Sequence, residues 1–507
     1  MTVPKSRVAR AWAVATGVLT LAATACGPAA QPPRTTTPRP AAPSPTTVPS
    51  TTVSPTPEAT VAPAEFARVS QLVDDAIAAH RLPGAVVLIG HAGRIVFRNA
   101  FGSRKLAGEP GLDGVPAPAE PMTTDTLFDL ASLTKSLTTA TAIMQLYEQG
   151  KVQLDEPVQT YLPDFNPAHD LRRARVTLRM LLTHTSGIAG DLSLDGPWGL
   201  ERADKAEGIH RALGAWVVSD PGELFHYSDI NFIILGALLE KLTGEPEDIY
   251  IRHNVFAPLR MDDTYYLPPA KACGPHQIRG TAIVLDKNAP ENGDCPPDTW
   301  STDLLGRIAP TAHDGDTPGL TPAYGHLLRG TVHDPTARRM GGVAGSAGMF
   351  STAHDLGLYA QALLDRLAGR ASTFPLTQSS LALMTSPQQP GHNPQQLEVA
   401  NTAARNVIGT TPDSLLAPNY PAIAGQDLRG LGWDIDTAHS RPRGAVFPIG
   451  SFGHTGFTGV SLWIDPGSDT YVIVLANVIH QPGGPPIAKL SGEIATVTAR
   501  ALHLYGN

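Results

Sequence analysis

Apolar residues near residue 64 recur at helical spacing and then give way to continuous runs. Between residues 64 and 80 they lie three or four positions apart, which predicts an amphipathic helix. An apolar run at 84–89, a polar turn at 91–94 and a second run at 95–97 predict a β-hairpin. We therefore expect a helix followed by two antiparallel strands.

The far end of the chain carries a matching pattern. Apolar runs at 460–464 and 471–476 flank a turn at 466–468, and a long amphipathic pattern covers about 485–505. The middle, about 130–390, is richer in helices and loops. The predicted fold class is α/β, with one antiparallel sheet built from both termini, flanked by helices and interrupted by a mostly helical region. The cleft between the two parts is the natural place for a site.

The first 26 residues have the pattern of an export signal. A positively charged start precedes an apolar stretch at 11–22 that is too short to span a bilayer comfortably, and the small residues at 23–25 stand directly before Cys26. This order predicts a lipoprotein whose Cys26 carries the lipid anchor, outside the cytoplasm. The alternative is ordinary secretion with an incidental cysteine.

Residues 27–63 are rich in Pro, Thr and Ser and poor in apolar side chains. Such a composition buries no core and favours an extended, solvated tether. The remaining part, 64–507, is long enough for one large α/β domain with insertions.

Charge and cysteine content narrow the possible partners. The net charge of -8 comes without a basic stripe, which argues against nucleic acid. After Cys26 only Cys273 and Cys295 remain, within a predicted surface insertion at 270–307. In an exported protein they can form a disulfide, and the alternative is two free thiols. Their spacing does not indicate a metal cluster, so we expect neither a metal nor a cofactor.

Three short motifs carry the candidate chemistry, and the first is S-x-x-K at 132–135. A helix predicted at 132–149 places Lys135 one turn beyond Ser132 on the same face. An ammonium there can help to remove the hydroxyl proton if burial lowers the pKa of the lysine. Taken alone, the stretch fits equally a helix cap followed by a solvated lysine.

The second motif, Y-S-D, precedes a strongly apolar helix. Tyr227 can act as a phenolate base and later as an acid if a cation such as Lys135 lowers its pKa. The alternative is a tyrosine that anchors a loop, with Ser228 or Asp229 capping the helix.

The third motif, H-T-G, comprises His454, Thr455 and Gly456 at the edge of a predicted strand. Gly456 lets a substrate approach the backbone closely. The backbone N–H of Phe457, paired with that of Ser132, can form an oxyanion hole. The alternative is a glycine-rich strand edge with a surface histidine.

The three motifs in this order resemble the serine β-lactamase and penicillin-binding-protein superfamily, in its class C-like branch of β-lactamase-related serine hydrolases. The stretches at 178–188, LRMLLTHTSGI, and at 341–364 resemble the same branch, and the similarity covers about 65–505. The resemblance implies that Ser132 is the acylated nucleophile and that Lys135 is its proton acceptor or electrostatic partner. It implies that Tyr227 is the general base and acid.

Two positions depart from the usual pattern of that superfamily. Asp229 stands where many relatives have Asn, and His454 stands where β-lactamases and carboxypeptidases have Lys. A histidine that is neutral at pH 7 is a poor clamp for a substrate carboxylate. Esterase-like and peptidase-like members often carry His there.

The leading hypothesis is an exported serine hydrolase that cleaves an ester, an amide or a D-amino-acid peptide through an acyl-enzyme on Ser132. Its substrate would be a small molecule or a fragment of the cell wall. One alternative is a D-Ala-D-Ala carboxypeptidase or β-lactamase. An alternative of another class is a non-catalytic binding protein of the cell envelope.

Overall fold

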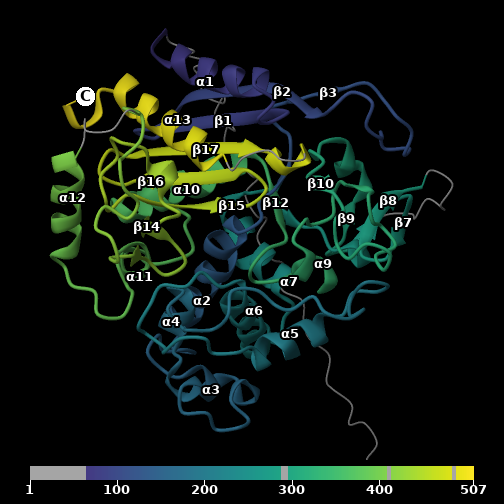
Figure 1. Ribbon diagram of the computed structural model, residues 1–507, viewed down its shortest axis with the longest axis horizontal. Helices are drawn as coiled ribbons and strands as arrows, with labels where there is room; N and C mark the ends of the chain where they lie inside the picture. Colours follow the sequence, from purple (N-terminus) through teal and green to yellow (C-terminus); the bar gives the residue numbers. More distant parts are fainter. Residues whose placement is uncertain (1–63, 287–294, 408–412, 482–486, 507) are drawn as a thin grey trace, which may run out of the picture. The chain divides into compact units, whose positions relative to one another are not determined.

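The computed structural model describes residues 64–286, 295–407, 413–481 and 487–506, so the predicted signal and tether lie outside the described residues. An eight-stranded antiparallel sheet in the order β13-β14-β15-β16-β17-β1-β2-β3 forms its centre (Figure 1). The strands are Gly84–His91 (β1), Arg94–Lys105 (β2), Glu120–Pro121 (β3), Leu428–Arg429 (β13), Asp434–Asp436 (β14), Phe452–Gly456 (β15), Val460–Asp465 (β16) and Thr470–Ala476 (β17). Since β1 pairs with β17 from Ala85↔Ala476 to His91↔Thr470, both ends of the domain build one sheet, as predicted.

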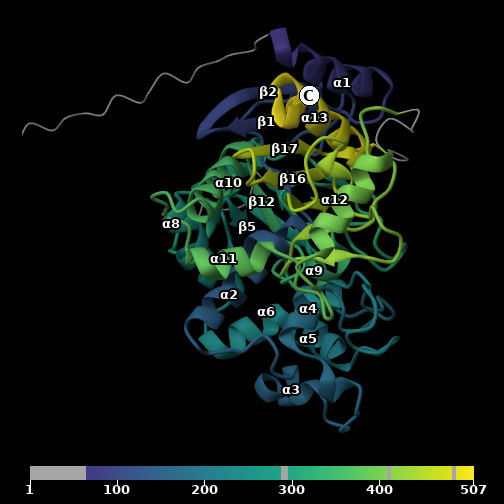
Figure 2. The ribbon, with the colours of Figure 1, turned by 90° about the vertical axis from the view of Figure 1, so that its left-hand side faces the viewer.

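Helices cover both faces of this sheet. Helices α1 (Ala67–Ala78) and α13 (Ala488–Ala501) pack on one face, and α10 (Ala353–Leu367) packs on the other (Figures 1 and 2). Strand β1 is buried on both sides, with Val87 facing the first pair of helices and Leu88 facing the second layer. This explains why its sequence is a continuous apolar run rather than an alternating one.

The middle of the chain is mainly helical, as predicted. Helix α6 (Asp229–Thr243) is apolar and lies beside the helix that follows Ser132. The helices of this part and of the segment after α10 are Thr141–Glu148 (α2), Val158–Tyr161 (α3), Leu178–Leu182 (α4), Lys205–Gly214 (α5), Asp229–Thr243 (α6), Glu247–Ile251 (α7), Ala257–Leu259 (α8), Pro335–Arg339 (α9), Gln378–Thr385 (α11) and Gln396–Val407 (α12). Within the described ranges, no helix is both long and apolar enough to cross a membrane.

A small three-stranded sheet, β4-β12-β5, connects the helical part to the main sheet. Its strands are Phe128–Asp129 (β4), Met349–Ser351 (β12) and Tyr265–Tyr266 (β5). Strand β4 delivers the chain to Ser132, so this sheet fixes the start of the first motif.

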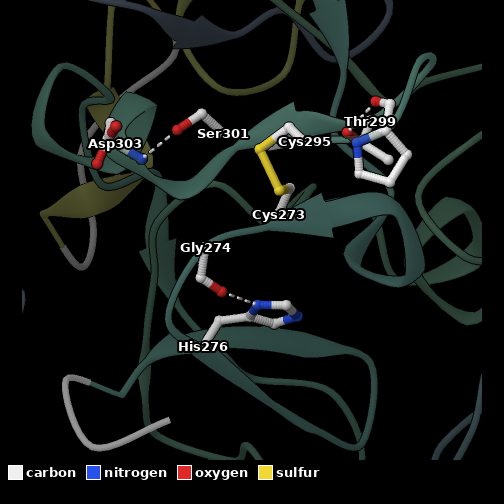
Figure 3. The surroundings of a disulfide bond; sticks show 8 residues. Cys273, Gly274, His276, Cys295, Thr299, Ser301 and Asp303 are labelled. Atoms are coloured by element: carbon white, nitrogen blue, oxygen red, sulfur yellow. Dashed lines mark hydrogen bonds between the residues drawn. A yellow bond between two sulfur atoms is a disulfide. The ribbon is translucent and has the colours of Figure 1, made fainter. Parts of the chain in front are cut away.

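The predicted insertion forms short strands and carries a disulfide. Strands β6 (Ala272–Cys273) and β9 (Trp300–Ser301) pair in parallel, and Cys273 is joined to Cys295 with 5.7 Å between their Cα atoms (Figure 3). The expected pairing is therefore present, and the alternative of two free thiols is wrong. Strands β7 (His276–Arg279) and β8 (Ala282–Leu285) form a hairpin within the same segment, and β10 (Ala312–His313) pairs with β11 (Leu327–Leu328) just after it.

Candidate active site

Ser132 follows a strained turn at the end of β4. Ala131 has a φ of 44°, a left-handed conformation that is uncommon for a residue with a side chain. Its N–H donates a hydrogen bond to Asp129 Oδ1 at 2.9 Å, and the N–H of Leu130 donates to the carbonyl of Met349 at 2.8 Å. These bonds hold a turn that projects Ser132 from the strand end, and such held strain is typical of functional sites.

The helix predicted after Ser132 is present, but its first part is wider than an α-helix. Lys135–Ala140 forms a π-helical segment, and α2 continues from Thr141. π-Helical turns are rare and often mark functional sites. The side chain of Lys135 nevertheless reaches back to Ser132, as the spacing predicted, with 2.9 Å between Nζ and Oγ.

The buried ammonium of Lys135 has three partners. It donates to Ser132 Oγ at 2.9 Å and to the carbonyl of Ser346 at 2.9 Å, and it lies 2.7 Å from Asp229 Oδ1. Two hydrogen bonds and one carboxylate therefore surround the ammonium and favour its charged form. The alternative of a solvated lysine is wrong.

The protonation of Lys135 differs from the expectation. Burial opposes its charge, but Asp229 and Tyr227 outweigh burial and raise the pKa of Lys135 above its usual range. The ammonium therefore keeps its proton at neutral pH, and the condition under which Lys135 could take the hydroxyl proton, a pKa lowered by burial, is not met. In this state Lys135 fits the role of an electrostatic partner rather than that of a proton acceptor.

Tyr227 lies on the other side of the Ser132 hydroxyl, on the loop before α6. Its hydroxyl is close enough to the side chains of Ser132 and Lys135 for both to lower its pKa, and the Lys135 ammonium lies 5.1 Å from the ring centroid. Burial raises the pKa of Tyr227; Lys135 lowers it and Asp229 raises it, with a net shift upwards. The predicted influence of Lys135 has the right sign, but it does not bring the phenol into the neutral range.

The helix after the second motif begins as its sequence indicates. Ser228 is the N-cap of α6, because its hydroxyl accepts the N–H of Asn231 at 3.3 Å. Asp229, the first residue of the helix, turns its carboxylate to Lys135. The loop thus supplies both a capped helix and two polar groups to the site.

His454 lies inside β15 and is only 2% exposed, so the alternative of a surface histidine is wrong. Its Nδ1 is 2.7 Å from the carbonyl of Thr455. Burial lowers the pKa of His454 to about 3, against the attraction of Asp434. The imidazole is therefore neutral at pH 7 and supplies no fixed cation.

Gly456 brings β15 close to the turn before Ser132. A Cβ at this position would lie 2.5 Å from the carbonyl oxygen of Leu130. Thr458 strengthens the contact by donating its hydroxyl to the carbonyl of Asp129 at 2.7 Å. The close approach expected of Gly456 is therefore made by the protein's own backbone.

Phe457, on the turn between β15 and β16, is 74% exposed. Its ring stacks on that of His333 with 5.9 Å between centroids. A cavity of about 490 Å³ is lined by Thr455, Gly456 and Phe457, by His439, and by an apolar wall that includes Val460. The third motif therefore borders a cavity, although Ser132, Lys135 and Tyr227 are not part of its lining.

Several groups that support the site carry no pattern in the sequence. A buried ion pair joins Arg429 to Asp434, and Asp434 stands opposite Gly453, next to His454. The ring of His439 lies 5.2 Å from that of Tyr227. His184 is different, because it lies in the stretch 178–188, whose sequence resembles the β-lactamase-related branch.

A half-buried Ser132 that accepts a hydrogen bond from the buried Lys135, with Tyr227 beside the ammonium, defines a serine hydrolase of the S-x-x-K type. The chain belongs to the Beta-lactamase family, whose model matches residues 69–489.

Similar proteins are named as an amidase and as carboxypeptidases. The chain is 29% identical over 430 residues to an N-acetylmuramyl-L-alanine amidase of Bacillus subtilis (strain 168), covering 82% of this chain and 81% of that protein. It is 28% identical over 415 residues to a protein of Escherichia coli (strain K12) provisionally named D-alanyl-D-alanine carboxypeptidase, covering 80% of each chain.

Solved structures share the fold at lower identity. The unliganded simvastatin synthase LovD of Aspergillus terreus matches with a TM-score of 0.57 at 23% identity, covering 87% of this chain and 99% of that one. A class C β-lactamase of Rhodobacter sphaeroides matches with a TM-score of 0.52 at 21% identity, covering 85% and 99%. These matches confirm the predicted fold class.

Proposed function

We propose that this protein hydrolyses an ester or amide through an acyl-enzyme on Ser132. The observation that carries the proposal is the placement of Lys135 Nζ 2.9 Å from Ser132 Oγ and 5.1 Å from the centroid of the Tyr227 ring. A nucleophile needs a proton acceptor within hydrogen-bond reach and a stabiliser of developing negative charge. Tyr227 and Lys135 supply these two roles.

In acylation, the phenolate of Tyr227 takes the proton of the Ser132 hydroxyl while Oγ bonds to the carbonyl carbon. The carbonyl electrons move to its oxygen, which the backbone N–H groups of Ser132 and Phe457 stabilise. When the tetrahedral intermediate collapses, the bond to the leaving group breaks. Tyr227 returns its proton to that group. During these steps the ammonium of Lys135 stabilises the negative charge on the Tyr227 phenolate oxygen and on Ser132 Oγ.

In deacylation, the phenolate of Tyr227 takes a proton from water, and the hydroxide bonds to the acyl carbon. Collapse breaks the bond to Ser132 Oγ, releases the acid, and returns the proton to Oγ. Since the pKa of Tyr227 is raised, the reactive phenolate is scarce at neutral pH. The rate of acylation should therefore rise with pH throughout the neutral and alkaline range, up to the raised pKa of Tyr227.

The charges around Ser132 favour substrates without a free carboxylate beside the scissile bond. The neutral His454 offers no cation, and the charge of Lys135 is balanced by Asp229. Among the described residues of the three motifs, a carboxylate would find no unpaired cation to offset its desolvation. We therefore favour esters, amides and cell-wall peptides cleaved away from a free C-terminus.

The names of the relatives favour a D-Ala-D-Ala carboxypeptidase as the second candidate. A chromogenic cephalosporin and its methyl ester separate the two, because they differ only in the carboxylate. We expect the methyl ester to acylate Ser132 at least as fast as the free acid, with Ser132→Ala as the blank. A free acid that reacts tenfold faster or more would contradict our substrate class and favour the carboxypeptidase or β-lactamase.

The third candidate, a non-catalytic binding protein, requires a cleft that binds cell-wall fragments without turning them over. Release of nitrophenol from short-chain nitrophenyl esters by the parent, and none by Ser132→Ala or Tyr227→Phe, would exclude it. Equal release by all three proteins would contradict the serine hydrolase mechanism.

We also propose that the chain is exported and anchored by a lipid on Cys26. The support is the order of charged start, apolar stretch and small residues before Cys26, followed by the Pro- and Thr-rich residues 27–63. Metabolic labelling with a fatty acid in a bacterial host should label the parent but not Cys26→Ala. Label on neither protein, with both in the medium, would favour plain secretion.

A further inference from the structure

His184 lies against Tyr227, outside the three motifs. Its ring stacks on the ring of Tyr227, with 4.4 Å between centroids and 29° between planes. It is fully buried and also packs against Phe225 and Phe232. The buried side of the Tyr227 ring therefore rests on an imidazole.

The same residue holds the backbone on both sides of Tyr227. The carbonyl of His184 accepts the N–H of His226 at 2.8 Å, and its Nδ1 accepts the N–H of Ser228 at 3.1 Å. A backbone N–H can only donate, so Nδ1 carries no proton and the proton of the neutral ring is on Nε2. Burial and the nearby cations Arg429 and Lys135 keep the pKa of His184 well below its usual range, which maintains this neutral form.

His184 reaches this position through an unusual backbone conformation. Its φ is 57°, in the left-handed region, directly after α4. The N–H of Thr185 bonds back to the carbonyl of Met180 at 2.9 Å and fixes the turn. A strained residue that also makes three separate contacts with one loop is evidence for a positioning role.

We propose that His184 is the positioning residue of Tyr227, setting both the ring plane and the backbone of the base. The inference rests on the proposed function, in which Tyr227 transfers the proton of Ser132. The other polar groups that face Tyr227 are Lys135, Asp229, His439 and His454. In the described structure, His184 differs from these four groups because it is hydrogen-bonded to both residues that flank Tyr227, His226 and Ser228.

The test compares two replacements that divide the roles of the ring. His184→Phe keeps an aromatic ring for stacking but cannot accept the N–H of Ser228. His184→Asn can accept that N–H but offers no ring. His226→Ala is the matched control. It removes an exposed imidazole next to Tyr227 in the sequence but keeps the hydrogen bond from the backbone N–H of residue 226 to the carbonyl of His184.

The readout is the rate at which a fluorophosphonate phosphonylates Ser132 Oγ, with release of fluoride, per titrated active site, which a loss of folded protein does not change. Misplacing a base by about 1 Å costs on the order of 100-fold in rate. We expect His184→Phe to react roughly 10- to 100-fold more slowly than the parent, with part of the rate restored in His184→Asn. His226→Ala should match the parent.

A double variant tests whether His184 acts through Tyr227. On a Tyr227→Phe background, His184→Phe should cause no further loss per site. A full additional loss on that background, or an unchanged rate in both single His184 variants, would overturn the positioning role. A parent-like rate in Tyr227→Phe alone would instead overturn the proposed mechanism, so the two failures are distinguishable.

Discussion

The ammonium of Lys135 lies 2.7 Å from Asp229 Oδ1, and this ion pair sets the electrostatics of the Ser132 site. Asp229 raises the pKa of Lys135 and also that of Tyr227. A carboxylate at this position therefore fixes the cation but makes the phenolate base harder to form.

Asp229→Asn tests this effect with an isosteric change. Without the negative charge, the pKa of Tyr227 falls, so the alkaline rise in the acylation rate should move to lower pH and the rate per site at neutral pH should increase. The unpaired Lys135 should cost on the order of 3 kcal/mol of unfolding free energy. Fluorophosphonate rates across the pH range and thermal unfolding measure the two effects.

Asp220→Asn serves as the control for this prediction. Asp220 belongs to the same loop, but its side chain is 57% exposed and its partner is Arg175. It should leave both the pH profile and the stability unchanged. An alkaline rise that does not move in Asp229→Asn would contradict the role given to the ion pair.

Glu247 predicts a pH-dependent stability. This fully buried carboxyl accepts the hydroxyl of Thr139 at 2.9 Å, and burial raises its pKa from 4.5 to about 7. Because the folded protein holds the proton more tightly, the stabilisation relative to the unfolded chain is complete below pH 4.5 and is lost as the pH rises to about 7. Between pH 4.5 and about 7, the contribution of Glu247 to the free energy of unfolding should fall by about 3 kcal/mol.

Glu247→Gln should remove that part of the pH dependence, as measured by denaturant unfolding at pH values from about 4.5 to 8. The gap in stability between the variant and the parent should widen in favour of the variant as the pH rises. Glu245→Gln, an exposed neighbour, is the control. Parallel curves for Glu247→Gln and the parent would contradict the raised pKa.

Gly456→Ala tests the contact between β15 and the Ser132 turn. The added methyl group would lie 2.5 Å from the carbonyl oxygen of Leu130, so strand and turn must separate. We expect a loss of about 1–3 kcal/mol in unfolding free energy and slower acylation per site. Gly214→Ala, where nothing lies within 4 Å of the added group, should change neither. A parent-like acylation rate in Gly456→Ala would show that the contact does not position Ser132.

Much of the fold follows from local sequence patterns. The apolar runs that became β1 and β17 are long enough to predict strands, and the polar Ser228 before an apolar run predicts the start of α6. The π-helical segment after Ser132 was not predicted, because residues 132–149 have ordinary helical spacing. The π-helical conformation goes with contacts to distant segments, such as the hydrogen bond from the Ser136 hydroxyl to the carbonyl of Gly432.

The sequence predicted which residues come together around Ser132. It did not predict which of them are charged. The spacing of Ser132 and Lys135 is local, whereas the pKa of Lys135 depends on Asp229, which reaches it only through the packing of α6. The burial of His454 likewise depends on β14 and β16, its neighbours in the sheet. Linear sequence names such groups but does not say which of them is neutral.

The most direct test of the central claim is the intact mass of the protein after incubation with a fluorophosphonate, with Ser132→Ala treated in parallel. We expect one adduct on the parent, located on Ser132 by peptide mapping, and none on the variant. No adduct on a folded parent, or an equal adduct on Ser132→Ala, would contradict an activated Ser132 and with it the proposed hydrolase.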